Sequence, residues 1–142
     1  MSKLLIPFDS SRHHIYVEFE LLDDKGIVRK GRGILDTGAP RTEFADSYLS
    51  HLGILDIGHN ADVKMPDGQQ TKKYHKIVLP SVSICGHHFK DTEFIVSRFE
   101  KSWGIHALIG LDLFRNARIT IDYKSAQIIS EPYELKNQLV KP

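Results

Sequence analysis

The chain has 142 residues, of which 41% are hydrophobic and 26% charged, and its formal net charge is +1. This length predicts a single domain spanning 1–142, and the composition is that of a soluble globular protein with a hydrophobic core. Balanced charge argues against a protein that binds nucleic acid or an anionic membrane through bulk electrostatics. No apolar run reaches the ~20 residues that a membrane span needs.

The N-terminus and the cysteine content bear on location. The first seven residues contain an apolar stretch too short for a signal-peptide core, with no small-residue cleavage site behind it. The single cysteine, Cys85, excludes an intramolecular disulfide and favours a reducing compartment. We therefore expect a cytoplasmic protein.

Most of the chain alternates between apolar and polar residues, which is typical of β-strands. In the expected strand 14–22 one face is apolar, formed by Ile15, Val17, Phe19 and Leu21. Residues 23–26 predict a hairpin turn in which Gly26 adopts positive φ, and the chain returns through 27–35. A break follows at Asp36-Thr37-Gly38.

The remaining elements are short. We expect a helix that Asp46 caps and Gly53 ends. The polar stretch 61–79, with a turn at Pro66-Asp67-Gly68, predicts a long exposed hairpin. Further elements follow in chain order: strands 82–85 and 89–96 around Gly86, the segment 108–110, a short helix at 111–116, and strands 119–123 and 126–129. The pattern indicates a small, mainly β protein with two short helices.

The segment around Asp36 carries the chemistry. Gly33-Ile34-Leu35 form an apolar strand that delivers the Asp36 carboxylate, and Thr37 and Gly38 follow at once. Glycine permits a tight turn just past the acid, so the carboxylate is held at a strand end, which suits general acid–base catalysis. The alternative is an Asx-type turn between a strand and a helix.

Peptide hydrolysis adds a second requirement. One carboxylate cannot both activate a water and protonate a peptide nitrogen, whereas two close carboxylates that share one proton can. The chain has no second Asp-Thr-Gly or Asp-Ser-Gly, and Asp112 and Asp122 lack the following glycine. If Asp36 is catalytic, the second acid must come from a second copy across a two-fold axis.

Two motifs resemble those of the retropepsin-like aspartic proteases. Ile34-Leu35-Asp36-Thr37-Gly38-Ala39, followed by Thr42, is similar to the active-site motif, and Leu-Ile-Gly-Leu-Asp-Leu-Phe at 108–114 is similar to the second signature. Residues 118–123 resemble the next strand in bacterial and ubiquitin-shuttle members, and the likeness covers roughly 16–129.

The resemblance implies a closed β-barrel of the acid-protease fold, assembled as a homodimer. Paired Asp36 carboxylates would hydrolyse peptide or protein substrates through an activated water, with no cofactor and no metal. Thr37, Gly38 and Ala39 would support the active-site loop, and Thr37 would hydrogen-bond across the dimer. Substrate contacts would come from a flap tip at Pro66, Asp67 and Gly68 and from Leu108, Ile109 and Gly110.

The chain also departs from the viral pattern. Pro40 and Arg41 stand where viral members usually carry acids, and the flap tip has one glycine and Asp67. Because Arg41 follows the first motif and Asp112 the second, the charges of the viral members are exchanged. This predicts an Arg41–Asp112 ion pair, either within one chain or across the dimer; alternatively both face solvent. Trp103 lies in the unmatched stretch 97–106 and could line a pocket or belong to the core.

Other chemistry-bearing residues favour structural readings. The pairs His13-His14 and His87-His88 point to opposite faces of a strand, so we expect solvated histidines and no metal site. Cys85 reads as a small buried hydrophobe in a strand rather than as a nucleophile. Two basic clusters read as solvated strand faces: Lys72, Lys73 and Lys76, and Arg29, Lys30 and Arg32.

These observations favour an aspartic endopeptidase, with two alternatives. A dimeric peptide-binding module could retain the fold without catalysis, although such a module has no need of two facing carboxylates. A monomer with an unrelated β fold would leave Asp36 as a turn residue.

Overall fold

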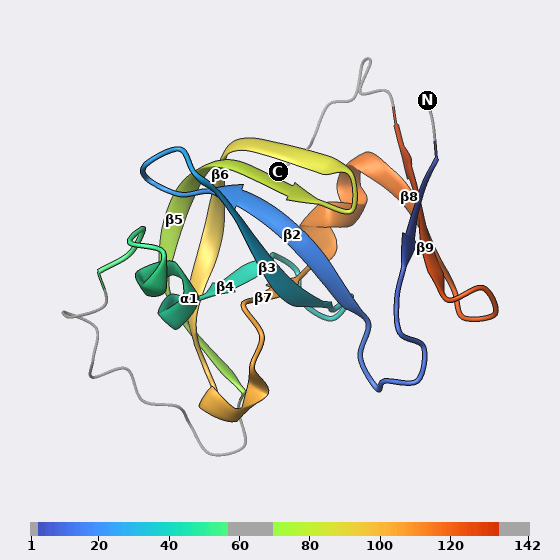
Figure 1. The fold of residues 1–142 in the computed structure, drawn as a ribbon, viewed down its shortest axis with the longest axis horizontal. Coiled ribbons are helices and arrows are strands. Elements are labelled where there is room, and N and C mark those ends of the chain that lie inside the picture. Colours follow the sequence, from blue (N-terminus) through green and yellow to red (C-terminus); the bar gives the residue numbers. More distant parts are fainter. Residues whose placement is uncertain (1–2, 57–69, 134–142) are drawn as a thin grey trace.

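A computed structural model describes residues 3–56 and 70–133, and most of its strands close into one β-barrel (Figure 1). The strand order around the barrel is β2-β3-β7-β4-β6-β5. Its strands are β2 (Tyr16–Leu22), β3 (Val28–Leu35), β4 (Glu43–Ala45), β5 (Thr71–Ile84), β6 (His87–Phe99) and β7 (Ala107–Ile109). The prediction of a mainly β, closed barrel is confirmed.

A second sheet and several short helices complete the described part. The sheet is antiparallel and contains, in order, β1 (Leu4–Pro7), β9 (Gln127–Pro132) and β8 (Ala117–Asp122), beside the barrel (Figure 1). The helices are α1 (Asp46–His51) and the 3₁₀ segments η2 (Lys101–Trp103) and η3 (Leu111–Asn116). Among the described residues no helix is long and apolar enough to cross a membrane.

The core fills the barrel with the apolar face predicted for the first long strand. Phe19 is 1% exposed, and its ring packs edge-to-face against Phe44, which in turn packs against Phe94, with centroid separations of 5.4 and 5.2 Å. Gly31 lies opposite Phe19 in the register of β2 and β3. A Cβ at this glycine would lie 2.3 Å from the Phe19 ring, so the missing side chain makes room for the aromatic core.

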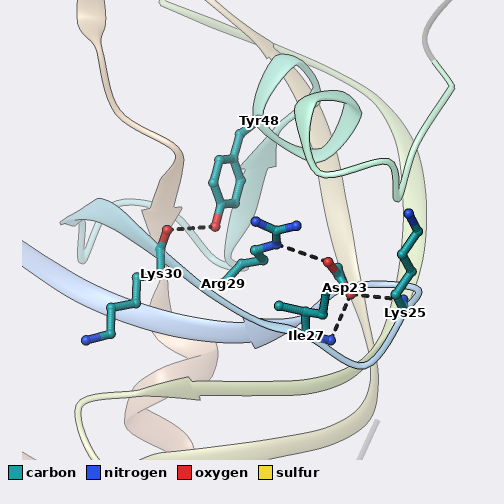
Figure 2. Close-up of polar contacts among 6 residues, drawn as sticks. All are labelled: Asp23, Lys25, Ile27, Arg29, Lys30 and Tyr48. Atoms are coloured by element: carbon teal, nitrogen blue, oxygen red, sulfur yellow. Dashed lines mark hydrogen bonds and ion pairs between the residues drawn. The ribbon is translucent and has the colours of Figure 1, made fainter.

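The β2–β3 turn is built around a buried carboxylate (Figure 2). Asp23 Oδ1 accepts hydrogen bonds from the N–H groups of Lys25 and Ile27, each 2.9 Å long, and Oδ2 accepts one from Arg29 Nε at 3.0 Å. Gly26 has φ +75°, as the predicted hairpin turn requires. The hydrogen bond from Ile27 is the main cause that lowers the pKa of Asp23.

Helix α1 begins at the residue predicted to cap it, so its N-cap lies one position earlier than expected. Ala45 occupies the N-cap, and Asp46 is the first helical residue, so the prediction that Asp46 caps the helix is wrong. Instead the buried Asp46 carboxylate binds Arg98 Nε at 2.5 Å and the Tyr74 hydroxyl at 2.7 Å. Gly53, with φ +77°, follows the helix end as predicted.

Strands β5 and β6 form one long hairpin where two were expected. Residues 71–79 continue without a break to Ile84 and pair with β6. Residues 61–69 of the predicted 61–79 hairpin, including 66–68, lie outside the described residues. Cys85 and Gly86 form the turn, with φ +50° and +78°, so Cys85 is buried in a turn rather than in a strand. This backbone matches the twist of the paired strands.

A histidine joins the barrel to the three-stranded sheet. His87, at the start of β6, lies 8% exposed and hydrogen-bonds through Nε2 to Ser130 Oγ in β9 at 2.9 Å. The expectation that this histidine is solvated is therefore wrong, because β9 covers it. Burial lowers the pKa of His87.

Candidate active site

Two strands from distant parts of the chain position Asp36. Strand β3 ends at Leu35, immediately before the acid, and pairs in parallel with β7. The N–H of Leu35 donates to the carbonyl oxygen of Ile15 at 2.9 Å, and the N–H of Asp36 donates to that of Ile109 at 2.8 Å. The Asp36 backbone is therefore fixed on the frame of the barrel, and its side chain is half-buried.

The residues after Asp36 form a tight turn. Asp36 Oδ1 accepts a hydrogen bond from the N–H of Gly38 at 2.8 Å, and the N–H of Ala39 donates to the Asp36 carbonyl at 3.1 Å. Ala39 is buried, whereas Thr37 and Gly38 are exposed at the tip. The Asx-type turn considered from the sequence is thus present, and it orients the carboxylate rather than excluding a chemical role for it.

The second signature packs directly behind this turn. The N–H of Leu111 donates to the Ala39 carbonyl at 2.8 Å. A Cβ at Gly110 would lie 2.6 Å from the Ala39 oxygen and 2.6 Å from the Arg41 carbonyl carbon. Only glycine allows the two segments to approach this closely.

The predicted Arg41–Asp112 ion pair is absent from the described structure. The Asp112 carboxylate accepts two hydrogen bonds from Thr42, one from its N–H at 2.9 Å and one from its hydroxyl at 2.6 Å. The Thr42 hydroxyl oxygen in turn accepts a hydrogen bond from the N–H of Gly110 at 3.1 Å. Arg41 turns to β6, where it lies 3.0 Å from the carbonyl oxygen and 3.6 Å from the carboxylate of Glu93. The buried Thr42 hydroxyl and N–H need an acceptor, which Asp112 supplies without the arginine.

Asp36 opens onto a cleft of about 500 Å³. The other residues that line it are Gln70, Thr71, Lys72, Lys73, Trp103 and Leu108. Of the predicted substrate contacts, Leu108 lines this cleft, Ile109 and Gly110 are buried behind the loop, and Pro66, Asp67 and Gly68 lie outside the described residues. Both readings considered for Trp103 hold. The residue is half-buried, with its ring centroid 5.7 Å from that of Phe99, and it also lines the cleft.

A larger cavity of about 660 Å³ lies elsewhere, between the β1 segment and strands β2 and β3, and Asp36 does not line it. It contains Cys85, whose pKa burial raises to about 11, so the thiol remains protonated at neutral pH. Among residues 3–56 and 70–133, no three His, Cys, Asp or Glu side chains cluster in a way that could hold a metal ion. The smaller cleft beside Asp36 is therefore the better candidate site.

Sequence reasoning missed several members of this site. Lys72 and Lys73 were assigned to a solvated face, and nothing local to them signals a cleft, because the wall forms only when β5 pairs with β6. Asp112 was assigned the wrong partner. A signal did exist for Thr42, which belongs to the first motif and whose short polar side chain is suited to bracing a neighbouring backbone.

Comparison with known proteins agrees with this geometry. A family model described as "Aspartyl protease" matches residues 22–113, which is more than half of the chain and includes the first motif and residues 108–113 of the second. A search of curated proteins found no match.

Solved structures share the fold. A retropepsin-like aspartic protease from Rickettsia conorii has 22% identity and a TM-score of 0.60, covering 91% of this chain and 90% of that one. The retroviral protease-like domain of Ddi1 from Leishmania major has 18% identity and a TM-score of 0.51, covering 89% and 98%. The barrel is thus a retropepsin-like fold, and with the match of the family model it shows that this chain belongs to the aspartyl protease family.

Proposed function

We propose that the protein is an aspartic endopeptidase that acts as a homodimer, with Asp36 from each copy forming the catalytic pair. The observation that carries the proposal is Asp36 itself: its backbone is tied to Ile109, its side chain is oriented by Gly38, and it faces an open cleft. No other acid lines this cleft in the described structure. Membership of the aspartyl protease family and the retropepsin-like fold support this reading.

A second copy supplies what one chain lacks. Two facing carboxylates at short range share one proton, because two negative charges at that distance repel each other. Thr37 and Gly38 are exposed on the single chain, at the tip of the loop that carries Asp36. In the proposed dimer the two tips meet about the two-fold axis, and the Thr37 side chains hydrogen-bond across it.

The reaction then follows from the protonation states of the pair. The ionised Asp36 takes a proton from a water whose oxygen attacks the peptide carbonyl carbon, and the protonated Asp36 donates its proton to the carbonyl oxygen. The resulting tetrahedral intermediate collapses when the C–N bond breaks: the nitrogen takes a proton from the protonated Asp36, and one hydroxyl of the intermediate gives its proton to the other Asp36, so the pair again carries one proton. The products are a new carboxyl end and a new amino end, and no covalent enzyme intermediate forms. The substrate binds as an extended strand in the cleft.

An unbiased peptide-library digest tests the proposal. Wild type should cleave peptides, Asp36→Asn should not, and Asp24→Asn, which changes an exposed aspartate in the β2–β3 turn, should keep full activity. Activity should rise with the square of enzyme concentration wherever a solution mass measurement shows that monomer dominates. Full activity of Asp36→Asn, or of a strictly monomeric species, would overturn the mechanism. Binding of peptides without cleavage by wild type would instead identify a peptide-binding module.

A further inference from the structure

The cleft beside Asp36 carries more positive than negative charge. Lys72 and Lys73, neighbours on β5, both line it, and Asp36 is its only acidic lining residue in the described structure. Among the described lining residues the balance is therefore two lysines against one aspartate, in a chain whose overall formal charge is only +1. The charge is local to the cleft and not a property of the whole surface.

The backbone that carries these lysines is fixed by strand pairing. Lys72 lies opposite Arg98 and Lys73 opposite Ser97 in the register of β5 and β6. At the end of the strand the N–H of Glu100 donates to the carbonyl oxygen of Gln70 at 2.9 Å. The backbone of both lining lysines is thus held in place by a paired strand.

The acids that belong to neighbouring elements are engaged elsewhere. Glu43, which is 3% exposed in β4, accepts a hydrogen bond from the Ser97 hydroxyl at 2.7 Å. Glu100 accepts one from the hydroxyl of Ser102. Within the described residues neither Lys72 nor Lys73 has an acidic group within 4.0 Å, so their charges are available to a ligand.

Two apolar residues also line the cleft, beside the polar Gln70 and Thr71. Trp103 presents its ring to the cleft from η2, and Leu108 lies beside Asp36 on β7. A peptide side chain that contacts these walls would be apolar or aromatic, whereas one that reaches the lysines would be anionic.

From this arrangement we propose that the cleft selects acidic peptides, in which an Asp or Glu side chain lies close to the scissile bond beside an apolar residue. Lys72 and Lys73 are the specificity-determining residues, and Trp103 and Leu108 receive the apolar neighbour. This inference rests on the proposed peptidase function. It assigns the substrate class by charge complementarity, since the lysines that line the cleft attract a carboxylate and repel a basic side chain.

Matched peptides test the preference. Sets that differ only by Glu, Gln or Lys at one position near the scissile bond are compared at pH 6, where the peptide carboxylates are ionised. We expect kcat/KM for the Glu peptide to exceed that for the Gln peptide by about fivefold, the size of a solvent-exposed ion pair, and the Lys peptide to be worst. Raising the salt concentration should shrink the ratio, because exposed charges are screened. Equal rates for Glu and Gln, or faster cleavage of the Lys peptide, would overturn the inference.

Binding provides a readout that does not depend on catalysis. Trp103 is the only tryptophan of the chain. In the Asp36→Asn variant, a change in tryptophan fluorescence on adding a tryptophan-free peptide therefore reports that the peptide has bound in the cleft. The Glu peptide should bind more tightly than the Gln peptide in this variant too. If wild type cleaves nothing while this ranking holds, the peptidase proposal fails and the charge preference stands. If no peptide binds, or if the ranking is absent, the charge preference fails.

Matched variants assign the effect to the two lysines. The double variant Lys72→Gln with Lys73→Gln should give equal kcat/KM for the Glu and Gln peptides. The double variant Lys72→Glu with Lys73→Glu should cleave the Gln peptide faster than the Glu peptide. Lys76→Gln and Lys90→Gln remove exposed lysines from the same hairpin that do not line the cleft, and should leave the ratio unchanged. A preference that survives the double Gln variant, shown by circular dichroism to be folded, would exclude the lysines as its cause.

Discussion

Asp112 accepts two hydrogen bonds from Thr42, one from its N–H at 2.9 Å and one from its hydroxyl at 2.6 Å. The two residues lie 70 positions apart in the chain, so this contact fastens the η3 segment to the loop that follows Asp36. Thr42 is 1% exposed, and its polar groups have little access to water. Asp112 is therefore a structural support of the candidate site.

Removing this support should cost stability. Asp112→Ala leaves the N–H of Thr42 without its acceptor, which is expected to lower the free energy of unfolding by about 2–3 kcal/mol. Asp112→Asn keeps one acceptor oxygen and should cost less. Urea titration followed by circular dichroism measures both.

Arg41→Ala is the matched comparison for Asp112→Ala. Because Arg41 and Glu93 are 41% and 49% exposed, breaking their contact should cost less than about 1 kcal/mol. Exchanging the charges of Arg41 and Asp112 should rescue nothing, since the two side chains do not pair. A double variant more stable than Asp112→Arg alone would contradict this assignment.

The close approach at Gly110 predicts a strong effect of a single methyl group. In Gly110→Ala the new Cβ meets backbone atoms 2.6 Å away on both Ala39 and Arg41, which cannot move without displacing the Asp36 loop. We expect a loss of about 3 kcal/mol in the free energy of unfolding. Gly26→Ala has no atom within 4 Å and should cost only the ~1 kcal/mol of a left-handed backbone. Similar melting curves for the two variants would show that the loop yields freely.

The buried Asp23 predicts stability that depends on pH at acid values. Its pKa is lowered in the folded protein, chiefly by the hydrogen bond from Ile27, so the ionised form is favoured by folding. The contribution is present above the unfolded pKa of about 3.9 and is lost as the pH falls through the lower folded pKa. Asp23→Asn should therefore be less stable than wild type at pH 7 and differ less at pH 2, in denaturant titrations at both values.

Asp24→Asn is the control for this prediction, because Asp24 is the exposed neighbour in the same turn. It should follow the wild-type pH profile. A constant difference between Asp23→Asn and wild type at both pH values would mean that ionisation of Asp23 does not contribute.

His87 predicts a second loss of stability, at milder acid pH. Burial lowers its pKa in the folded protein, so the unfolded chain takes up a proton first. Stability should fall as the pH drops from about 6.5, the unfolded value, toward the folded pKa. His87→Gln, which can still hydrogen-bond to Ser130, should flatten this fall, and hydrogen exchange at Ser130 and its neighbours in β9 reports the loosening directly.

Part of the fall in stability with decreasing pH should remain in His87→Gln, because burial also lowers the pKa of His106. His88→Gln changes the exposed neighbour and should leave the profile unaltered. An unchanged slope in His87→Gln would remove this histidine from the acid response.

The sequence predicted elements whose pattern is local. The alternation of Val17, Phe19 and Leu21 is visible within one strand, and the turns at Gly26 and Gly86 are visible from residue type alone. The three residues of β4 are all buried, so they show no alternation and were not predicted as a strand. The strand β5 was divided in the prediction into the end of a hairpin at residue 79 and a separate strand from 82, whereas in the structure it runs from Thr71 to Ile84.

The candidate site, too, was predicted where its residues are contiguous and missed where they come from distant segments. Asp36 and its turn were predicted because the motif is contiguous, whereas the partner of Asp112 depends on which side chain of a distant segment comes within reach. Arg41 and Thr42 can each donate a hydrogen bond to a carboxylate such as Asp112. Which of them does so depends on the path of the backbone, which the sequence does not show.

The hydrogen bond from Asp36 to Ile109 also has a consequence for protein synthesis. The ribosome makes Asp36 well before β7 (Ala107–Ile109), the strand whose carbonyl holds the Asp36 backbone. Pairing between such distant strands is slow to form and needs both of them. A nascent or prematurely terminated chain that ends before Ile109 cannot fix the loop that holds Asp36. The proposed proteolytic centre is therefore assembled only after Ile109 has been translated, which keeps shorter translation products from cleaving themselves or their neighbours.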